Sequence, residues 1–176
     1  MKYAAAVAII LAAVNYCFAE PLFELNYIVE NKFFTCNKEQ VVSSKKDKKL
    51  TLVLPAGTEG TKLSIDIEAM KKGNWAQYNT FLSEIENTSA GTVSLKLRFI
   101  RRAIDDRLIQ DENPLYDRVI KLLPGKNAIK IEVGPLSGSS ARGFMIENII
   151  FDLKNDNSFE VKLRIKDIQV LSLDDE

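Results

Sequence analysis

The stretch Thr61-Lys62-Leu63-Ser64-Ile65-Asp66-Ile67-Glu68 alternates strictly between polar and apolar residues. Successive side chains of a β-strand point to opposite faces of the sheet, so Leu63, Ile65 and Ile67 share one face and the polar residues share the other. The pattern therefore predicts a strand with one buried face and one solvated face.

The same period of two recurs along the rest of the chain. It is regular in Val93–Phe99, Ala128–Val133 and Phe159–Ile165, and shorter or less regular in Phe23–Phe33, Leu50–Leu54, Thr80–Glu86, Asp117–Leu123, Ile146–Leu153 and Asp167–Leu171. Turn residues such as Pro55-Ala56-Gly57 and Pro124-Gly125 separate these segments. About ten short, evenly spaced strands predict an all-β fold, an antiparallel sandwich or jelly roll. Only Glu68–Lys72 has weak helical character, over about one turn.

The N-terminus has the features of a secretory signal. Lys2 is followed by an apolar run from Tyr3 to Val14, and the small residue Ala19 stands at a plausible cleavage position. We expect cleavage after Ala19, which divides the chain into a signal peptide (1–19) and one β-sandwich domain (20–176). The product is expected to be secreted or periplasmic, and no second apolar run predicts a membrane span.

Composition excludes several classes of function. The 24 basic residues balance 24 acidic ones, so no surplus of positive charge favours a nucleic-acid partner. The chain has no histidine, which excludes Ser-His-Asp and Cys-His triads and the usual zinc enzymes. After signal removal Cys36 is the sole cysteine and cannot form an intramolecular disulfide. We expect a packed thiol there, with a reactive or intermolecular thiol as the alternative.

Three segments resemble those of galactose-binding-like jelly rolls, the fold of many carbohydrate-binding modules. They are Trp75–Ser89, Leu122–Ile131 with its Leu-Pro-Gly-x-Asn turn, and the closing hairpin from Ile146 to Val170. The resemblance spans residues 61–171 and implies a jelly-roll sandwich with a glycan or polysaccharide as partner. We expect Trp75 to cap the core, with a sugar-stacking platform as the alternative reading.

The ligand residues that we predict lie in the least strand-like segment, 101–118. A long polar connection on a rigid sandwich is a common place for binding groups, and planar polar side chains with an aromatic ring suit sugar hydroxyls and pyranose faces. The candidates are Arg101, Asp105, Asp106, Tyr116 and Arg118. The alternative is a solvated excursion whose charges pair with one another.

The sequence assigns no cofactor. Many relatives of this fold hold a calcium ion near the first strands, and Glu24, Glu30 and Asp167 are oxygen donors that could serve such a structural calcium. Their spacing does not resemble a dedicated calcium loop, so no metal is assigned. Asn87-Thr88-Ser89 is a formal N-glycosylation acceptor.

Two further functions remain open. The first is an envelope accessory or adhesive protein that binds a protein partner through a sheet face or an edge strand. The second is a small carboxylate-dependent glycosidase, because Ser64-Ile65-Asp66-Ile67-Glu68 resembles the catalytic strand of jelly-roll glucanases. Ser64 stands where those enzymes carry the carboxylate nucleophile, so we expect a protein without catalytic activity.

Overall fold

The computed structural model describes residues 22–37, 41–44, 49–73, 75, 78, 80–101, 114–133 and 146–171, with the backbone alone for 41–44 and 101. These residues contain one helix and ten strands. The elements are α1 (Leu25–Asn31), β1 (Phe34–Cys36), β2 (Val41–Ser44), β3 (Lys49–Leu54), β4 (Thr61–Asp66), β5 (Thr80–Asn87), β6 (Val93–Arg101), β7 (Pro114–Leu122), β8 (Gly125–Glu132), β9 (Ile146–Lys154) and β10 (Val161–Leu171).

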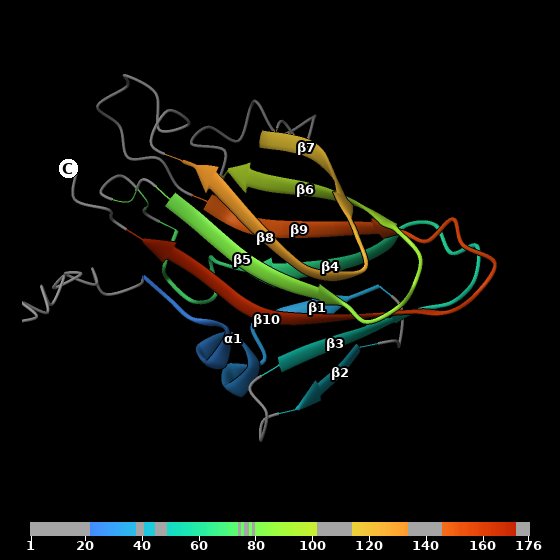
Figure 1. Ribbon diagram of the computed structural model, residues 1–176. Coiled ribbons are helices and arrows are strands. Elements are labelled where there is room, and N and C mark those ends of the chain that lie inside the picture. Colours follow the sequence, from blue (N-terminus) through green and yellow to red (C-terminus); the bar gives the residue numbers. More distant parts are fainter. Residues whose placement is uncertain are drawn as a thin grey trace, which may run out of the picture.

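The strands form two antiparallel five-stranded sheets. Sheet A has the order β1-β4-β9-β6-β7, and sheet B has the order β2-β3-β10-β5-β8. The two sheets lie face to face as layers (Figure 1). The prediction of an antiparallel jelly-roll sandwich is therefore confirmed.

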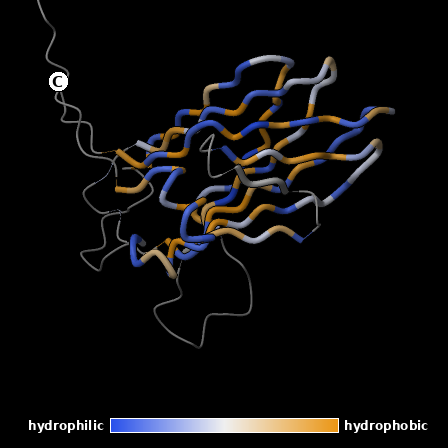
Figure 2. The backbone as a smooth tube through the Cα atoms, turned by 90° about the horizontal axis from the view of Figure 1, so that it is seen from below, coloured by the Kyte–Doolittle hydropathy of each residue, from blue (hydrophilic) through white to orange (hydrophobic). Residues whose placement is uncertain are grey.

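The burial of apolar side chains, which occupy alternate positions along the strands, holds the two layers together. Figure 2 shows the change between hydrophilic and hydrophobic residues along the strands. In sheet A, Leu97 of β6 lies opposite Phe151 of β9, and both are fully buried. Burying one such side chain contributes about 1.5–3 kcal/mol. A slip of one residue would turn the whole apolar set toward water, so the buried face fixes the register.

The N-terminal segment departs from the prediction. Phe23–Phe33 is expected to be a strand, but α1 occupies most of it and packs against β3 and β10. The reason lies in the spacing of its apolar residues, since Leu25, Ile28 and Val29 recur at helical intervals and are buried on one face. Lys32 ends the helix in the left-handed region with φ 56°.

Two other boundaries also differ from the prediction. The predicted strands Phe159–Ile165 and Asp167–Leu171 merge into one strand, β10, which begins at Val161 and whose register shifts at a bulge between Ile165 and Asp167. The expected connection 101–118 is shorter, because residues from Pro114 onward pair with β6 as strand β7. Partner strands override a polar local composition here.

Trp75 caps the core, as predicted. Its side chain is 1% exposed, and its Nε1 donates a hydrogen bond of 3.0 Å to the carbonyl of Lys72. The indole packs edge-on against Phe99, which in turn contacts Phe81. Because the ring is buried, it does not offer a platform to a sugar. Cys36 lies half-buried in β1, as a packed thiol would.

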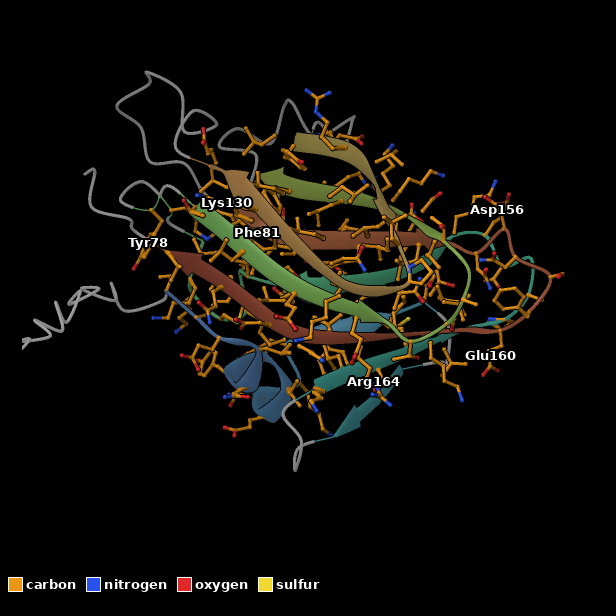
Figure 3. The ribbon with its side chains drawn as sticks, in the orientation of Figure 1. Tyr78, Phe81, Lys130, Asp156, Glu160 and Arg164 are labelled. Atoms are coloured by element: carbon orange, nitrogen blue, oxygen red, sulfur yellow. The ribbon has the colours of Figure 1, made fainter. Side chains whose placement is uncertain are left out.

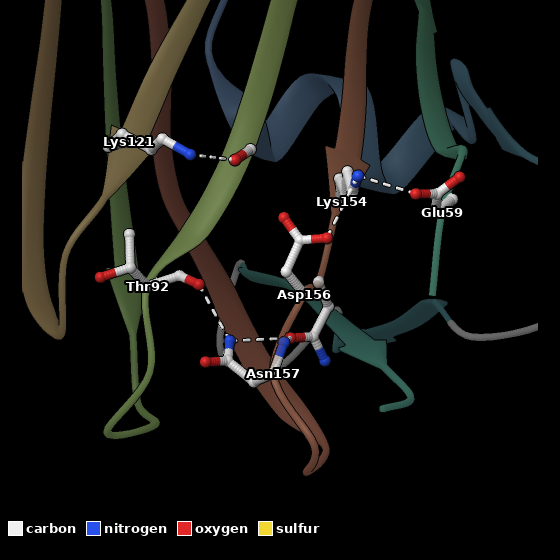
Figure 4. Close-up of polar contacts among 8 residues, drawn as sticks. Glu59, Thr92, Lys121, Lys154, Asp156 and Asn157 are labelled. Carbon is white, nitrogen blue, oxygen red and sulfur yellow. Dashed lines mark hydrogen bonds and ion pairs between the residues drawn. The ribbon is translucent and has the colours of Figure 1, made fainter. Parts of the chain in front are cut away.

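Buried asparagines join the turns at one end of the sandwich. The Nδ2 of Asn155 donates to the carbonyls of Leu54, Pro55 and Phe159 at 2.9–3.0 Å. The next turn residues extend this network, since Asn157 donates to the carbonyl of Thr92 (Figure 4). These bonds satisfy backbone carbonyls that the strand ladders leave unpaired.

Asn87 belongs to the same kind of network. Its Nδ2 donates to the carbonyls of Gly91 and Leu122, its Oδ1 accepts from the amide of Ser89, and the side chain is buried. The formal glycosylation acceptor therefore holds its amide inside the folded protein. In the described part of the chain, no helix has the length and hydropathy to cross a membrane.

We expect Asn155→Asp to destabilise the fold by about 2–3 kcal/mol, because a carboxylate would replace the donor that three carbonyls share. Urea unfolding followed by circular dichroism measures this loss. Asn31→Ala is the control, since the exposed Asn31 makes one bond, to the carbonyl of Tyr27, and its loss should change the free energy of unfolding by less than about 0.5 kcal/mol. An equal loss of unfolding free energy in both variants would show that the three hydrogen bonds of Asn155 do not stabilise the fold.

Candidate functional site

The two ends of the sandwich differ in their connections. At one end short turns join the strands, for example residues 123–124 between β7 and β8. At the other end β6 stops at Arg101, paired with Ile146 at the start of β9, and β8 stops at Glu132, paired with Thr80 at the start of β5. The described residues that flank the segments 102–113 and 134–145 therefore lie at this end, which we call the loop-bearing end. Figure 3 labels Tyr78 there, and Asp156 and Glu160 at the turn end.

The predicted ligand residues fall into two groups. Arg101 is the last residue of β6, and its backbone lies at the loop-bearing end. Its side chain, and Asp105 and Asp106 entirely, lie outside the described residues. Tyr116 and Arg118 are described, and they lie on β7.

Tyr116 and Arg118 share one side of β7. Tyr116 pairs with Phe99 and Arg118 with Leu97, so both side chains leave the strand on the side of the core. The Tyr116 ring stacks on Phe99 with centroids 5.1 Å apart. Burial raises the pKa of the Tyr116 phenol above its ordinary value, and the charge of Arg118 opposes this rise in part. The exposed Arg118 thus neighbours a half-buried, rigidly supported ring.

A second set of polar groups covers the outer side of sheet A. Strand pairing aligns Ser64 with Ile150, Ile150 with Arg98, and Arg98 with Asp117 across four strands. The neighbouring rows add further polar side chains on the same side. We call this set the polar face, and it comprises Ser64, Lys96, Arg98, Asp117, Asn148 and Asp152.

Partners within the polar face hold its side chains in place. The Arg98 Nη2 lies 3.7 Å from the Asp152 Oδ2, and the Lys96 Nζ lies 3.1 Å from the Asp117 Oδ2. The hydroxyl of Ser64 donates to the Asn148 Oδ1 at 3.3 Å. The Arg98 side chain is only 12% exposed. A guanidinium confined in this way loses little rotamer freedom when it binds a ligand.

The outer side of sheet B is also charged but more open. The Arg164 Nη1 lies 3.7 Å from the Glu86 Oε2, as in the Arg98 pair, yet the Arg164 side chain is 51% exposed. A hydrogen bond from Lys166 is the main reason why the pKa of Glu86 is lowered. Exposed pairs of this kind contribute little to stability and are screened by salt. Figure 3 labels Arg164 on this side.

The polar face is not predicted by the sequence. Arg98, Asn148 and Asp152 occupy ordinary polar positions of alternating strands, where solvated side chains are the rule. The signal in the sequence is the alternation itself, which shows that these residues point away from the core. Strand order then decides which of them become neighbours.

The acidic residues of the described part do not gather into a metal site. No group of three or more His, Cys, Asp or Glu there could hold a metal ion. Glu24 lies close enough to raise the pKa of Asp167, whereas Glu30 is an exposed residue of α1. The Oδ1 of Asp66 accepts the amide of Ala69 at 2.8 Å and so caps a turn.

Comparison with known proteins shows the fold. No protein-family model matches the sequence, and no curated protein matches it. Among solved structures, the agarase AgWH50C is similar with a TM-score of 0.61 and 12% identity, over 89% of this chain and 25% of the agarase. An exo-beta-agarase has a TM-score of 0.58 and 11% identity, over 90% and 26% of the two chains. The chain thus spans about a quarter of these enzymes.

The CBM22-1 xylan-binding domain from Paenibacillus barcinonensis Xyn10C is also similar. Its TM-score is 0.51 at 11% identity, over 89% of this chain and 98% of that domain. The chain therefore has the β-sandwich fold found in carbohydrate-binding modules.

We predict that Asp167→Asn stabilises the fold at pH 7 more than at pH 4. Burial is the main cause that raises the pKa of the Asp167 carboxyl, and nearby Glu24 and Glu84 raise it further. A raised folded-state pKa favours folding below the unfolded pKa of about 3.9, and this contribution is lost as the pH rises through the folded value. The neutral amide avoids that loss and can still accept the hydrogen bond from Gln169.

Thermal unfolding at both pH values measures the difference between this variant and the parent. Asp156→Asn is the control, because Asp156 is exposed and pairs with Lys154. We expect that control to be no more stable than the parent at pH 7. A stability gain of Asp167→Asn that is equal at pH 4 and pH 7 would argue against burial of the charge as its cause.

Proposed function

We propose that this protein is a non-catalytic glycan-binding module, and that the polar face, together with the loop-bearing end, contacts the saccharide. The observation that carries the proposal is the near-complete overlap with a xylan-binding domain in size and fold. The enzymes with a similar fold match over a quarter of their length, which leaves three quarters of each enzyme without a counterpart here.

The chemistry of the polar face suits a polyhydroxylated ligand. Planar groups suit vicinal hydroxyls, and here the guanidinium of Arg98 can donate hydrogen bonds while the carboxylate of Asp152 accepts them. The paired hydroxyl and amide of Ser64 and Asn148 add neutral hydrogen-bonding groups beside them. Ile100 and Ile150, half-buried between these groups, offer apolar surface to the C–H groups of a sugar ring.

The loop-bearing end and the core-facing side of β7 supply the remaining contacts. Arg101, Asp105, Asp106, Tyr116 and Arg118 retain the roles that the sequence predicts for them in this proposal. Asn148 and Ile100 pair with each other in the row next to this end, so one extended saccharide can reach both regions. Export through the N-terminal signal would bring the module to glycans outside the cell or in the periplasm.

Catalysis has less support than binding. Asp66, a carboxylate of the strand that resembles the glucanase strand, caps a turn by accepting the amide of Ala69. A retaining glycosidase needs two carboxyl groups roughly 5–5.5 Å apart across the scissile bond. Ser64, at the position of the nucleophile in the resembled enzymes, instead donates its hydroxyl to Asn148.

We expect Arg98→Lys to weaken glycan binding roughly tenfold or more, because lysine keeps the positive charge but lacks the planar guanidinium group and its paired N–H donors. A glycan array identifies ligands, and affinity gel electrophoresis with xylan and agarose compares the variants. Arg164→Lys is the matched control, with the same 3.7 Å ion pair on the opposite sheet, and should bind like the parent. Arg118→Ala tests the core-facing side of β7, where Arg118 lies opposite Leu97.

Two results would overturn the proposal. The first is a folded protein that binds no glycan on the array and co-purifies with a protein partner instead, as an accessory protein would. The second is turnover of a chromogenic glycoside that Glu68→Gln abolishes. Equal weakening by Arg98→Lys and Arg164→Lys would refute the polar face as the contact surface while leaving glycan binding intact.

A further inference from the structure

Strand β7 is an edge strand of sheet A. Among the described residues it pairs with β6 on one side only. Its outer side carries Asp117, Val119 and Lys121 in alternate positions. Val119 is 64% exposed, the largest exposed fraction among the large apolar side chains described. An edge strand with an exposed β-branched residue is a template for pairing with another strand.

The order of these residues makes β7 complementary to itself. In an antiparallel pair of two β7 strands with Val119 opposite Val119, each Asp117 lies opposite Lys121 of the second copy. The same register places Arg118 opposite Ile120 and Tyr116 opposite Leu122, with side chains on matching sides. The apolar valines meet on the two-fold axis, flanked on each side by an attractive charge pair.

Other registers lack this match. A shift that centres the pair on Arg118 brings two guanidinium groups together on the axis. A shift that centres it on Ile120 places Lys121 opposite Val119 and leaves Asp117 without a cation from the second copy. Parallel pairing in register sets like charges opposite each other along the strand. Charges on edge strands ordinarily prevent self-pairing, but here their order favours one arrangement of it.

Existing contacts are compatible with that arrangement. Asp117 already faces Lys96 at 3.1 Å, and the Lys121 Nζ donates to the Ser94 hydroxyl at 2.7 Å (Figure 4). Lys96 and Ser94 both lie on β6, the strand that pairs with β7. They therefore hold the two charged groups from that side and leave the opposite edge of β7 uncovered by these contacts. A carboxylate has several acceptor sites and an ammonium has three donors, so each can add a partner.

We propose that the protein forms a two-fold symmetric dimer through antiparallel pairing of β7 edges, in the register centred on Val119. The partner is a second copy of this chain. A ladder over Tyr116–Leu122 is a small interface, so association is weak and depends on protein concentration. The charge pairs lie at the surface, so added salt weakens the dimer.

A charge swap tests the register. Asp117→Lys or Lys121→Asp alone places like charges opposite each other twice per dimer, and we expect each to weaken association at least about tenfold. The double variant carrying both changes restores opposite charges in this register and should regain association. Sedimentation velocity over a concentration series measures it, and thermal unfolding of each variant confirms that the monomer remains folded.

A cysteine at the axis tests the geometry independently. In a background of Cys17→Ser and Cys36→Ser, Val119→Cys should yield a disulfide-linked dimer under mild oxidation. Ala128→Cys is the control, because Ala128 is an exposed residue on β8, one of the two edge strands of sheet B, and this variant should remain monomeric under the same conditions. Monomeric sedimentation of the parent at its highest soluble concentration would overturn the proposal. So would a dimer that neither charge change weakens, or equal cross-linking at both positions.

Discussion

The structure depends on the burial of one face of each sheet against the other. Leu97 and Phe151, paired in the middle of sheet A, show the constraint, because a shift of one position in either strand would expose both. Once this register is set, it also determines which outward-facing side chains lie next to one another. The polar face and the outer side of β7 are consequences of how the core is packed.

The two ends of the sandwich differ in how their strands are connected. At the turn end, Asn87 and Asn155 use their side-chain amides to satisfy carbonyls of adjoining turns, which ties β-strands of both sheets together. At the opposite end the long connections begin and finish. Because the hydrogen-bonded turns make one end of the sandwich rigid, the other end and the outer faces are the regions best suited to contact with partners.

Arg98 and Arg164 illustrate how tertiary environment gives one residue type two roles. Both lie on central regions of a sheet and both sit 3.7 Å from a carboxylate oxygen. The guanidinium of Arg98 is largely covered by its neighbours, while that of Arg164 stands in solvent. The first has the restricted freedom that our proposal requires of a binding group, and the second is a solvated surface charge.

The sequence alone determined the all-β class, the identity of most strands and the buried role of Trp75, because a period of two and turn residues are local signals. It missed α1, whose helical spacing of Leu25, Ile28 and Val29 competes with strand-forming residues, and it placed Tyr116 and Arg118 in a loop. Only the tertiary structure decided that Arg98, Asn148 and Asp152 lie together and that β7 pairs only with β6 among the described strands. Those relations depend on strand order across the sheet, and residues about fifty positions apart carry no local record of their pairing.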